Sequence, residues 1–317
     1  AIGAVAGNAL TSGAGNVLIG MDAGKLVTTG SYNTVLGHEA GDAFATNTSH
    51  NTAIGYQALT SANNSGDGKN VAIGSGAGAL ITSGTDNICI GKAAGDGFDT
   101  ESQNIAIGSG AFGAAVNGAD ACVAIGYGAM YGAATQDGTV AIGKDALGAL
   151  TSGEQNVAIG YQALDAAQTT HFNVAVGSYA LSGVTGAGSK GYNTAVGDMA
   201  GFTLSTDNSA YNTLIGGRAG YAGTTGYTNN TVVGTFALDR CTTNASHNVA
   251  IGYAAMHGDF GANDVQHCVA IGGGDCLSGT LESTASGTVA IGHQAGMQLT
   301  SGSGNIAIGK DALNEQT

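Results

Sequence analysis

The sequence contains no proline and no tryptophan, and only 9% of its 317 residues are charged. Without proline, and without glycine at every third position, it cannot form a collagen triple helix. Its apolar runs are short and broken by glycine, so no segment is suited to crossing a membrane. Basic residues are scarce as well, 8 against 22 acidic ones, which gives a net charge of −14. Such a chain repels phosphate backbones and anionic lipids, so we expect no nucleic-acid partner and no membrane insertion.

Cysteine is also sparse. The five cysteines are odd in number, lie far apart and form no C-x-x-C pair. This spacing argues against a disulfide framework and against zinc or thioredoxin chemistry, so we interpret the cysteines as small apolar fillers.

Glycine, in contrast, is abundant, with 57 residues, and it marks an internal repeat. The pentapeptide Asn-Val-Ala-Ile-Gly and its variants occur 18 times from Gly3 to Gly309, at spacings of 17 to 20 residues. We number each repeat from the glycine of this motif, which is position 0. The pattern fills residues 1–317, so we expect a single repeat domain. Because the chain starts inside the pattern and without methionine, we also expect it to be a fragment of a longer fibre protein.

Positions −3 and −1 alternate with a small residue at −2. Position −1 is always Ile, Val or Leu, position −3 is Val, Ile or Thr, and position −2 is mostly Ala. This period of two predicts a short β-strand. We expect the −1 residues to stack in the core, namely Ile54, Ile73, Ile107, Ile125, Ile159, Ile251 and Ile291. The −2 alanines would then face the other side, where their small size favours close approach of another chain.

Two further positions predict the turns. The invariant glycine, for example Gly55, Gly108 and Gly160, suits a positive φ or a backbone too close to its neighbour for a Cβ. Position −4 is Asn in 13 of 17 complete copies, for example Asn51, Asn104 and Asn156. Asn stacked on Asn in successive coils predicts a ladder of side-chain amides. Position +3 is nearly always Ala, and a bulky apolar residue follows at +4 or +7.

One strand per repeat of about 18 residues predicts an all-β fold, a parallel β-solenoid of about 18 coils spaced by about 4.8 Å. Length varies only in the polar stretch between about +6 and −5, which we assign to loops. Each coil has few large apolar residues, which is a thin core. Association through the alanine positions would add to it, and a homotrimer is the simplest closed arrangement.

The segments Asn51 to Leu59 and Asn156 to Leu164 read N-T-A-I-G-Y-Q-A-L and N-V-A-I-G-Y-Q-A-L. They resemble the head repeats of trimeric autotransporter adhesins, and they are more similar still to the related repeats of bacteriophage tail fibres. The resemblance covers all 18 copies, and the spacing favours the phage type. It implies a left-handed β-roll in a stiff trimeric fibre that binds a surface.

No catalytic constellation is present, so we expect no enzyme and no cofactor. Histidines share the −5 position with tyrosine and phenylalanine, which indicates a place for a flat ring. Metal binding by three such histidines in a trimer, or calcium between acidic loops, stays an alternative. Aromatic residues concentrate in residues 192–227. They could stack on sugar rings, or they could cap coil corners and fill subunit seams; they are Tyr192, Phe202, Tyr211, Tyr221 and Tyr227.

The sequence therefore predicts a structural fibre or adhesin, most simply a phage tail-fibre shaft involved in host surface recognition. A bacterial trimeric adhesin head and a cell-made extracellular filament are the alternatives, and a monomeric ice-binding solenoid is a weaker rival. The partners expected are further copies of the chain and a cell-surface glycan or protein receptor. The expected location is the virion or the cell exterior.

Overall fold

A computed structural model shows an all-β parallel β-solenoid, which confirms the predicted fold class. The described residues contain no α-helix. They are 1–44, 47–63, 66–114, 118–132, 134–135, 137–185, 191–204, 209–223, 226–241, 244–258, 260, 264–279, 281 and 285–314. The chain divides into two compact units, unit 1 of residues 1–155 and unit 2 of residues 156–317.

Each complete repeat forms one strand of three residues, from position −3 to position −1. Unit 1 contains β1 (Val17–Ile19), β2 (Thr34–Leu36), β3 (Thr52–Ile54), β4 (Val71–Ile73), β5 (Ile88–Ile90), β6 (Ile105–Ile107), β7 (Val123–Ile125) and β8 (Val140–Ile142). Unit 2 contains β9 (Val157–Ile159), β10 (Val174–Val176), β11 (Thr194–Val196), β12 (Thr213–Ile215), β13 (Thr231–Val233), β14 (Val249–Ile251), β15 (Val269–Ile271), β16 (Val289–Ile291) and β17 (Ile306–Ile308).

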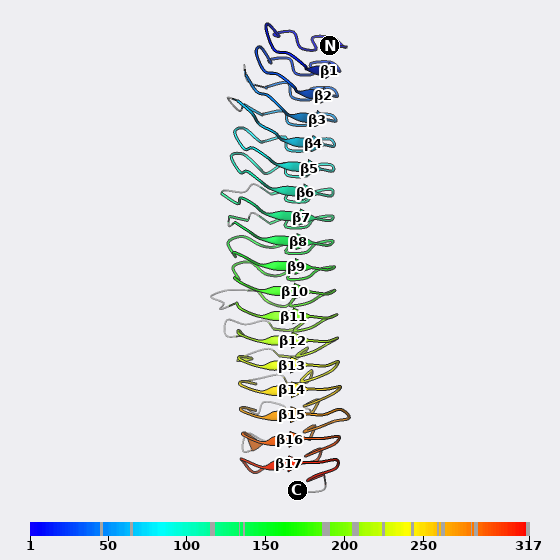
Figure 1. Cartoon of the computed structure of the whole chain (residues 1–317), viewed down its shortest axis with the longest axis vertical. Helices are drawn as coiled ribbons and strands as arrows, with labels where there is room; N and C mark the ends of the chain where they lie inside the picture. The colour runs from blue at the N-terminus through cyan, green and yellow to red at the C-terminus, as the bar shows by residue number, and fades with distance from the viewer. Residues whose placement is uncertain are drawn as a thin grey trace. The chain divides into compact units, whose positions relative to one another are not determined.

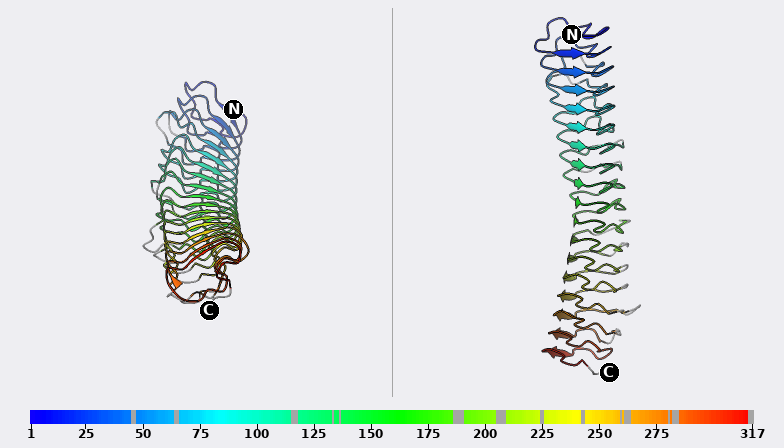
Figure 2. Two further views of the ribbon diagram at one scale, coloured as in Figure 1. Left: turned by 60° about the horizontal axis from the view of Figure 1, so that its bottom comes forward. Right: turned by 90° about the vertical axis from the view of Figure 1, so that its right-hand side faces the viewer.

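Within each unit, consecutive strands pair in parallel and in register, so each repeat position lies beside the same position of the next coil (Figure 1). Ala106, for example, is paired with Ala124. The strands line up on one side of each unit and the turns on the other (Figure 2). The first motif copy contributes only the isolated bridge between Ile2 and Ile19.

The strand faces are reversed relative to the prediction. In every strand the middle residue, position −2, is buried, whereas the residues on either side of it are half-buried or exposed. The residues expected in the core point outward: Ile73 and Ile159 are each 37% exposed, and Ile54, Ile107, Ile125, Ile251 and Ile291 are half-buried. The prediction that these −1 residues form the core was therefore wrong, and so was the placement of the −2 alanines outside.

The physical reason lies in the turns, which fill the narrow interior from the side opposite the strands. The +3 alanines are buried, and a bulky residue at +4 or +7 lies beside them. Phe98 at +7 and Phe112 at +4 of the next coil meet edge to face, with ring centroids 4.7 Å apart. Bulky residues at +4 and at +7 thus meet in the same interior. In most coils these side chains leave room for only an alanine on the strand. Larger middle residues are buried in five strands, namely Leu18, Val35, Cys89, Leu214 and Val232.

The glycine at position 0 is required for two reasons. It has φ between +121° and +152° at all 18 positions, a region that other residues rarely adopt. In addition, a Cβ at Gly108 would lie 2.4 Å from the carbonyl oxygen of Gly126, and Gly55 and Gly160 face the same obstacle on their next coils. The prediction for this column is therefore confirmed.

The predicted amide ladder is present in both units. The Oδ1 atom of Asn33 accepts a hydrogen bond from the backbone N–H of Asn51 at 3.0 Å, and Asn87 does the same for Asn104. In unit 2, Asn156 Oδ1 accepts from Asn173 N at 3.0 Å, and Asn156 Nδ2 donates to the Thr170 carbonyl at 2.7 Å. The ladder thereby satisfies backbone groups inside the coil.

Candidate functional site

The five rings expected to contact a ligand separate into three places. Tyr227 is buried, Tyr192 and Tyr211 lie in one column of exposed rings, and Phe202 and Tyr221 are half-buried in another column. Only an exposed ring can meet a ligand, so each place must be judged by itself.

Tyr227 is a core residue, and its interpretation as a ligand contact is corrected. It is 1% exposed, and its ring occupies the space that Gly220 and Gly223 leave in their coil. Burial raises the pKa of Tyr227 well above its ordinary value. Because this coil has no bulky residue at +4 or +7, the tyrosine supplies the apolar volume from the following loop.

Tyr192 and Tyr211 belong to a stack at position −5, which we call the ring ladder: Phe172, Tyr192 and Tyr211. The Phe172 and Tyr192 centroids are 4.8 Å apart, the Tyr192 and Tyr211 centroids are 5.3 Å apart, and the rings are nearly parallel. His247 and His267 stack in the same way further along unit 2. Since the rings cover one another's faces, the ladder presents mainly ring edges to solvent.

Phe202 and Tyr221 belong to a second series on the turn side of unit 2, which we call the aromatic edge. Its rings come from positions +1, +2 and +5 of successive coils: Tyr161, Tyr179, Phe202, Tyr221, Phe236 and Tyr253. The first four contact one another in order, the last two contact each other, and Arg218 lies between Tyr221 and Phe236. Sequence reasoning missed Tyr161, Tyr179, Phe236 and Tyr253. Reading positions +1 and +2 as columns, as was done for the strand, would have shown them.

The backbone holds the +2 side chains of this edge in a fixed conformation. Tyr179, Arg218 and Phe236 have φ values of 57°, 58° and 59°. Each lies in a tight turn that closes by a hydrogen bond from the +3 amide to the position 0 carbonyl, as from Ala180 N to Gly177 O at 3.3 Å. Left-handed φ recurs at +2 in both units, so it is a property of the coil and places one side chain per turn.

Unit 1 uses the same turn positions differently. There, Gln57 donates to Glu39 at 2.8 Å, and Lys25 lies 3.2 Å from Asp22. Polar pairs thus occupy positions +2 and +5 in these coils, although unit 1 also carries rings in these turns, Tyr56 and Tyr127 at +1 and Tyr131 at +5. The fold therefore does not require aromatic residues at these turn positions, and the aromatic edge results from the particular sequence of unit 2.

A charged cluster lies at one end of the Phe202 and Tyr221 pair. The Arg218 guanidinium is 4.3 Å from the Tyr221 ring centroid and 5.2 Å from that of Phe236. Its Nη2 atom lies 3.6 Å from Asp239, which also lies 3.2 Å from His257 Nε2. Burial raises the pKa of Asp239, and the charges of His257, Arg218 and Arg240 oppose that rise. The cluster fixes Arg218 against the rings.

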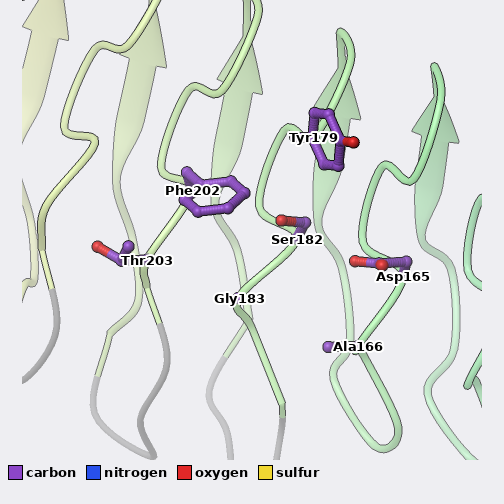
Figure 3. A pocket seen from close by; sticks show the side chains of 7 residues that line it. All are labelled: Asp165, Ala166, Tyr179, Ser182, Gly183, Phe202 and Thr203. Carbon is purple, nitrogen blue, oxygen red and sulfur yellow. The ribbon is translucent and has the colours of Figure 1, made fainter.

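At the other end of the pair lies an open hollow of about 500 Å³ (Figure 3). Three successive coils line it. The coil of β9 contributes Asp165 and Ala166, the coil of β10 contributes Tyr179, Ser182 and Gly183, and the coil of β11 contributes Phe202 and Thr203. The Tyr179 and Phe202 rings lie on either side of Ser182. Aromatic walls with a few hydroxyl and carboxylate groups are typical of small-molecule sites.

Metal and thiol chemistry find no support in the described parts of the chain. No group of three or more His, Cys, Asp or Glu side chains there could hold a metal ion. All five cysteines are buried, as expected of fillers. Burial raises the pKa of the Cys89 thiol to about 12 and that of Cys276 to about 11.

The hollow and the aromatic edge combine ring faces, hydroxyls and a carboxylate on a rigid turn, a set suited to binding and not to a proton relay. The described residues also include no helix long and apolar enough to cross a membrane. No family model, curated protein or solved structure matches this chain, so its function must be argued from the geometry.

Proposed function

We propose that this chain is a structural fibre segment that assembles with further copies of itself through the outward side of its strands. The observation that supports this is the aliphatic face, by which we mean the outward residues at positions −3 and −1 of β1–β8 in unit 1 and of β9–β17 in unit 2. All 17 residues at −1 are Ile, Val or Leu, and the 17 at −3 are Val or Ile in 12 cases and Thr in five.

Each unit thus presents two neighbouring columns of side chains that are apolar except for the threonines and carry no charge. Val17 is 47% exposed, Leu36 43% and Ile215 40%. Contiguous exposed apolar surface of this extent marks an interaction site on most soluble proteins. A flat, regular surface of β-branched side chains fits best against another surface of the same kind, which is what a second copy offers.

A homotrimer around a common axis closes such an assembly. Its interface would use the −1 and −3 residues in place of the −2 alanines expected from the sequence, and the ring ladder at −5 would lie beside it. The repeats resemble those of phage tail fibres, so the proposed setting is a virion fibre shaft that takes part in host surface recognition, without enzymatic activity or a cofactor.

The assembly is tested by sedimentation velocity of the intact chain and two double variants. Ile73→Asp with Ile107→Asp places two charges on the aliphatic face. Ser75→Asp with Ser109→Asp adds the same charges two residues along the chain, at exposed positions outside the face. We expect trimers for the wild type and the serine variant and monomers for the isoleucine variant. A monomeric wild type at micromolar concentration overturns the proposal.

The setting is tested separately by the genes beside the coding sequence. Capsid and baseplate genes support the virion fibre. An outer-membrane anchor domain encoded on the same chain overturns it in favour of a bacterial adhesin head.

A further inference from the structure

The +5 column of unit 2 contains a stack of rings that stops abruptly. Phe202 and Tyr221 occupy this position in the coils of β11 and β12, with centroids 5.2 Å apart and planes inclined by only 6°. In the preceding coil the same position is Ser182, and one coil further back it is Asp165. One face of Phe202 therefore lies on Tyr221, and the other is directed at the place of a serine.

The hollow lies at this position, above Ser182. Successive coils are spaced by about 4.8 Å, so Phe202 and Asp165 are separated by roughly two spacings, or 9.6 Å. That distance admits one saturated or aromatic ring between them. Ser182 and Gly183 form the floor, and Tyr179 forms a wall, with its ring centroid 6.0 Å from that of Phe202 and the two planes 80° apart.

We propose that the hollow binds one ring of a neutral oligosaccharide, stacked on Phe202 in the space above Ser182. This inference rests on the proposed function, since it supplies a receptor chemistry for a surface-binding fibre. The C–H face of a pyranose packs on an aromatic ring, while its hydroxyls need hydrogen-bonding groups at its edge. Asp165 accepts hydrogen bonds from such hydroxyls, and the Ser182 hydroxyl can donate or accept.

Charge favours a neutral sugar over an anionic ligand. The whole chain carries a net charge of −14, so a phosphate or a sialylated glycan would be repelled. Among the described residues, Arg218 lies against the Tyr221 ring and 3.6 Å from Asp239, so its charge is partly compensated there.

The experiment is an array of defined neutral, anionic and phosphorylated glycans probed with the intact chain, followed by calorimetric titration of the glycans that bind. Phe202→Ala should weaken binding about tenfold, and Asp165→Asn should weaken it by a similar factor. Ser182→Phe should abolish binding, because the new ring extends the stack of Phe202 and Tyr221 into the hollow. Tyr192→Ala, which removes a ring from the ring ladder, should bind like the wild type.

Several outcomes overturn the proposal: no binding to any neutral glycan, binding that Ser182→Phe leaves intact, or equal loss of binding in Tyr192→Ala. Preference for the anionic glycans also contradicts it. Sedimentation of the same variants separates this test from that of the proposed function, because the hollow is on the turn side and the aliphatic face is on the strand side. A trimer that binds no glycan refutes only the sugar site.

Discussion

In most strands the small residue at position −2 faces the core, whereas the larger aliphatic residues at positions −3 and −1 face outward. In β6, the inward Ala106 is fully buried, while the larger Ile105 and Ile107 beside it stay half-buried on the outer side. The inside is narrow and already filled from the turns, so it selects for small size. The outside is broad and flat, and it carries the greater apolar volume. Hydrophobicity alone therefore does not tell inside from outside in a thin solenoid.

The largest effect should come from placing the same charge on the two sides of β6. Ala106→Asp buries an unpaired carboxylate and should destabilise the coil by about 4 kcal/mol or more. Ile107→Asp leaves the carboxylate in contact with water and should cost the coil about 1 kcal/mol, mainly through lower β-propensity. Amide hydrogen exchange in the coils of β5, β6 and β7 measures this locally, at a dilution at which sedimentation shows the wild type and both variants to be monomers, so that loss of the proposed interface does not enter the comparison.

We expect fast exchange in these coils for Ala106→Asp and nearly native protection for Ile107→Asp. Greater loss of protection in Ile107→Asp would mean that the isoleucine side is the interior, as the sequence first suggested.

The period-two pattern predicts both the strands and their bounds, because alternation of β-branched and small residues at −3 to −1 is a local property. The glycine column and the asparagine ladder are predictable for the same reason, since one backbone contact repeats in every coil. The choice between the two strand faces is not local. It depends on Phe98, Phe112 and their equivalents reaching the strand from the opposite turn, and nothing within the strand reports this.

The candidate site shows the same limit. Tyr227 and Tyr221 look equivalent in the sequence, yet one fills a coil that contains Gly220 and Gly223 and the other lies on the edge. The hollow depends on the absence of a ring at Ser182, between positions that carry Asp165 and Phe202. A missing side chain is visible only once the repeats have been aligned into columns and the columns placed in space.

An intermediate effect should come from the inward ladder at −4. Asn248 Oδ1 accepts from the Cys268 backbone N–H at 2.9 Å, and Asn248 Nδ2 donates to the Val265 carbonyl at 2.9 Å. Asn248→Ala leaves the Cys268 N–H without this partner, whereas the Val265 carbonyl still accepts from the Ser246 backbone N–H at 3.2 Å, so the free energy of unfolding should fall by about 1–3 kcal/mol. Urea denaturation followed by circular dichroism, at fixed protein concentration, measures the change.

Cys268→Asn is the matched reverse substitution in the same ladder. The Cys268 Sγ lies 3.7 Å from the Ala285 carbonyl, where an amide nitrogen would donate a stronger hydrogen bond. We expect stabilisation by about 1 kcal/mol. Destabilisation by Cys268→Asn would show that the ladder needs the smaller side chain at this coil.

The smallest effect should come from Asp96, a half-buried carboxylate at position +5 of its coil. Its Oδ1 atom is buried without a hydrogen-bond partner among the described residues, and desolvation raises its pKa from the ordinary value of 3.8. The folded chain therefore holds this proton more tightly than the unfolded chain does. The resulting stabilisation is complete below pH 3.8 and is lost as the pH rises through the higher, folded-state pKa.

At neutral pH the charged Asp96 thus destabilises the folded chain, and Asp96→Asn removes this destabilisation. We expect the variant to melt slightly above the wild type at pH 7, and the difference to disappear near pH 3, where the wild-type carboxyl is protonated and neutral as well. Thermal unfolding at the two pH values measures this. Asp198→Asn, which removes an exposed carboxylate, controls for the change in net charge. An equal gain in both variants would assign the effect to the overall negative charge of the chain, and the burial of Asp96 would then have no part in it.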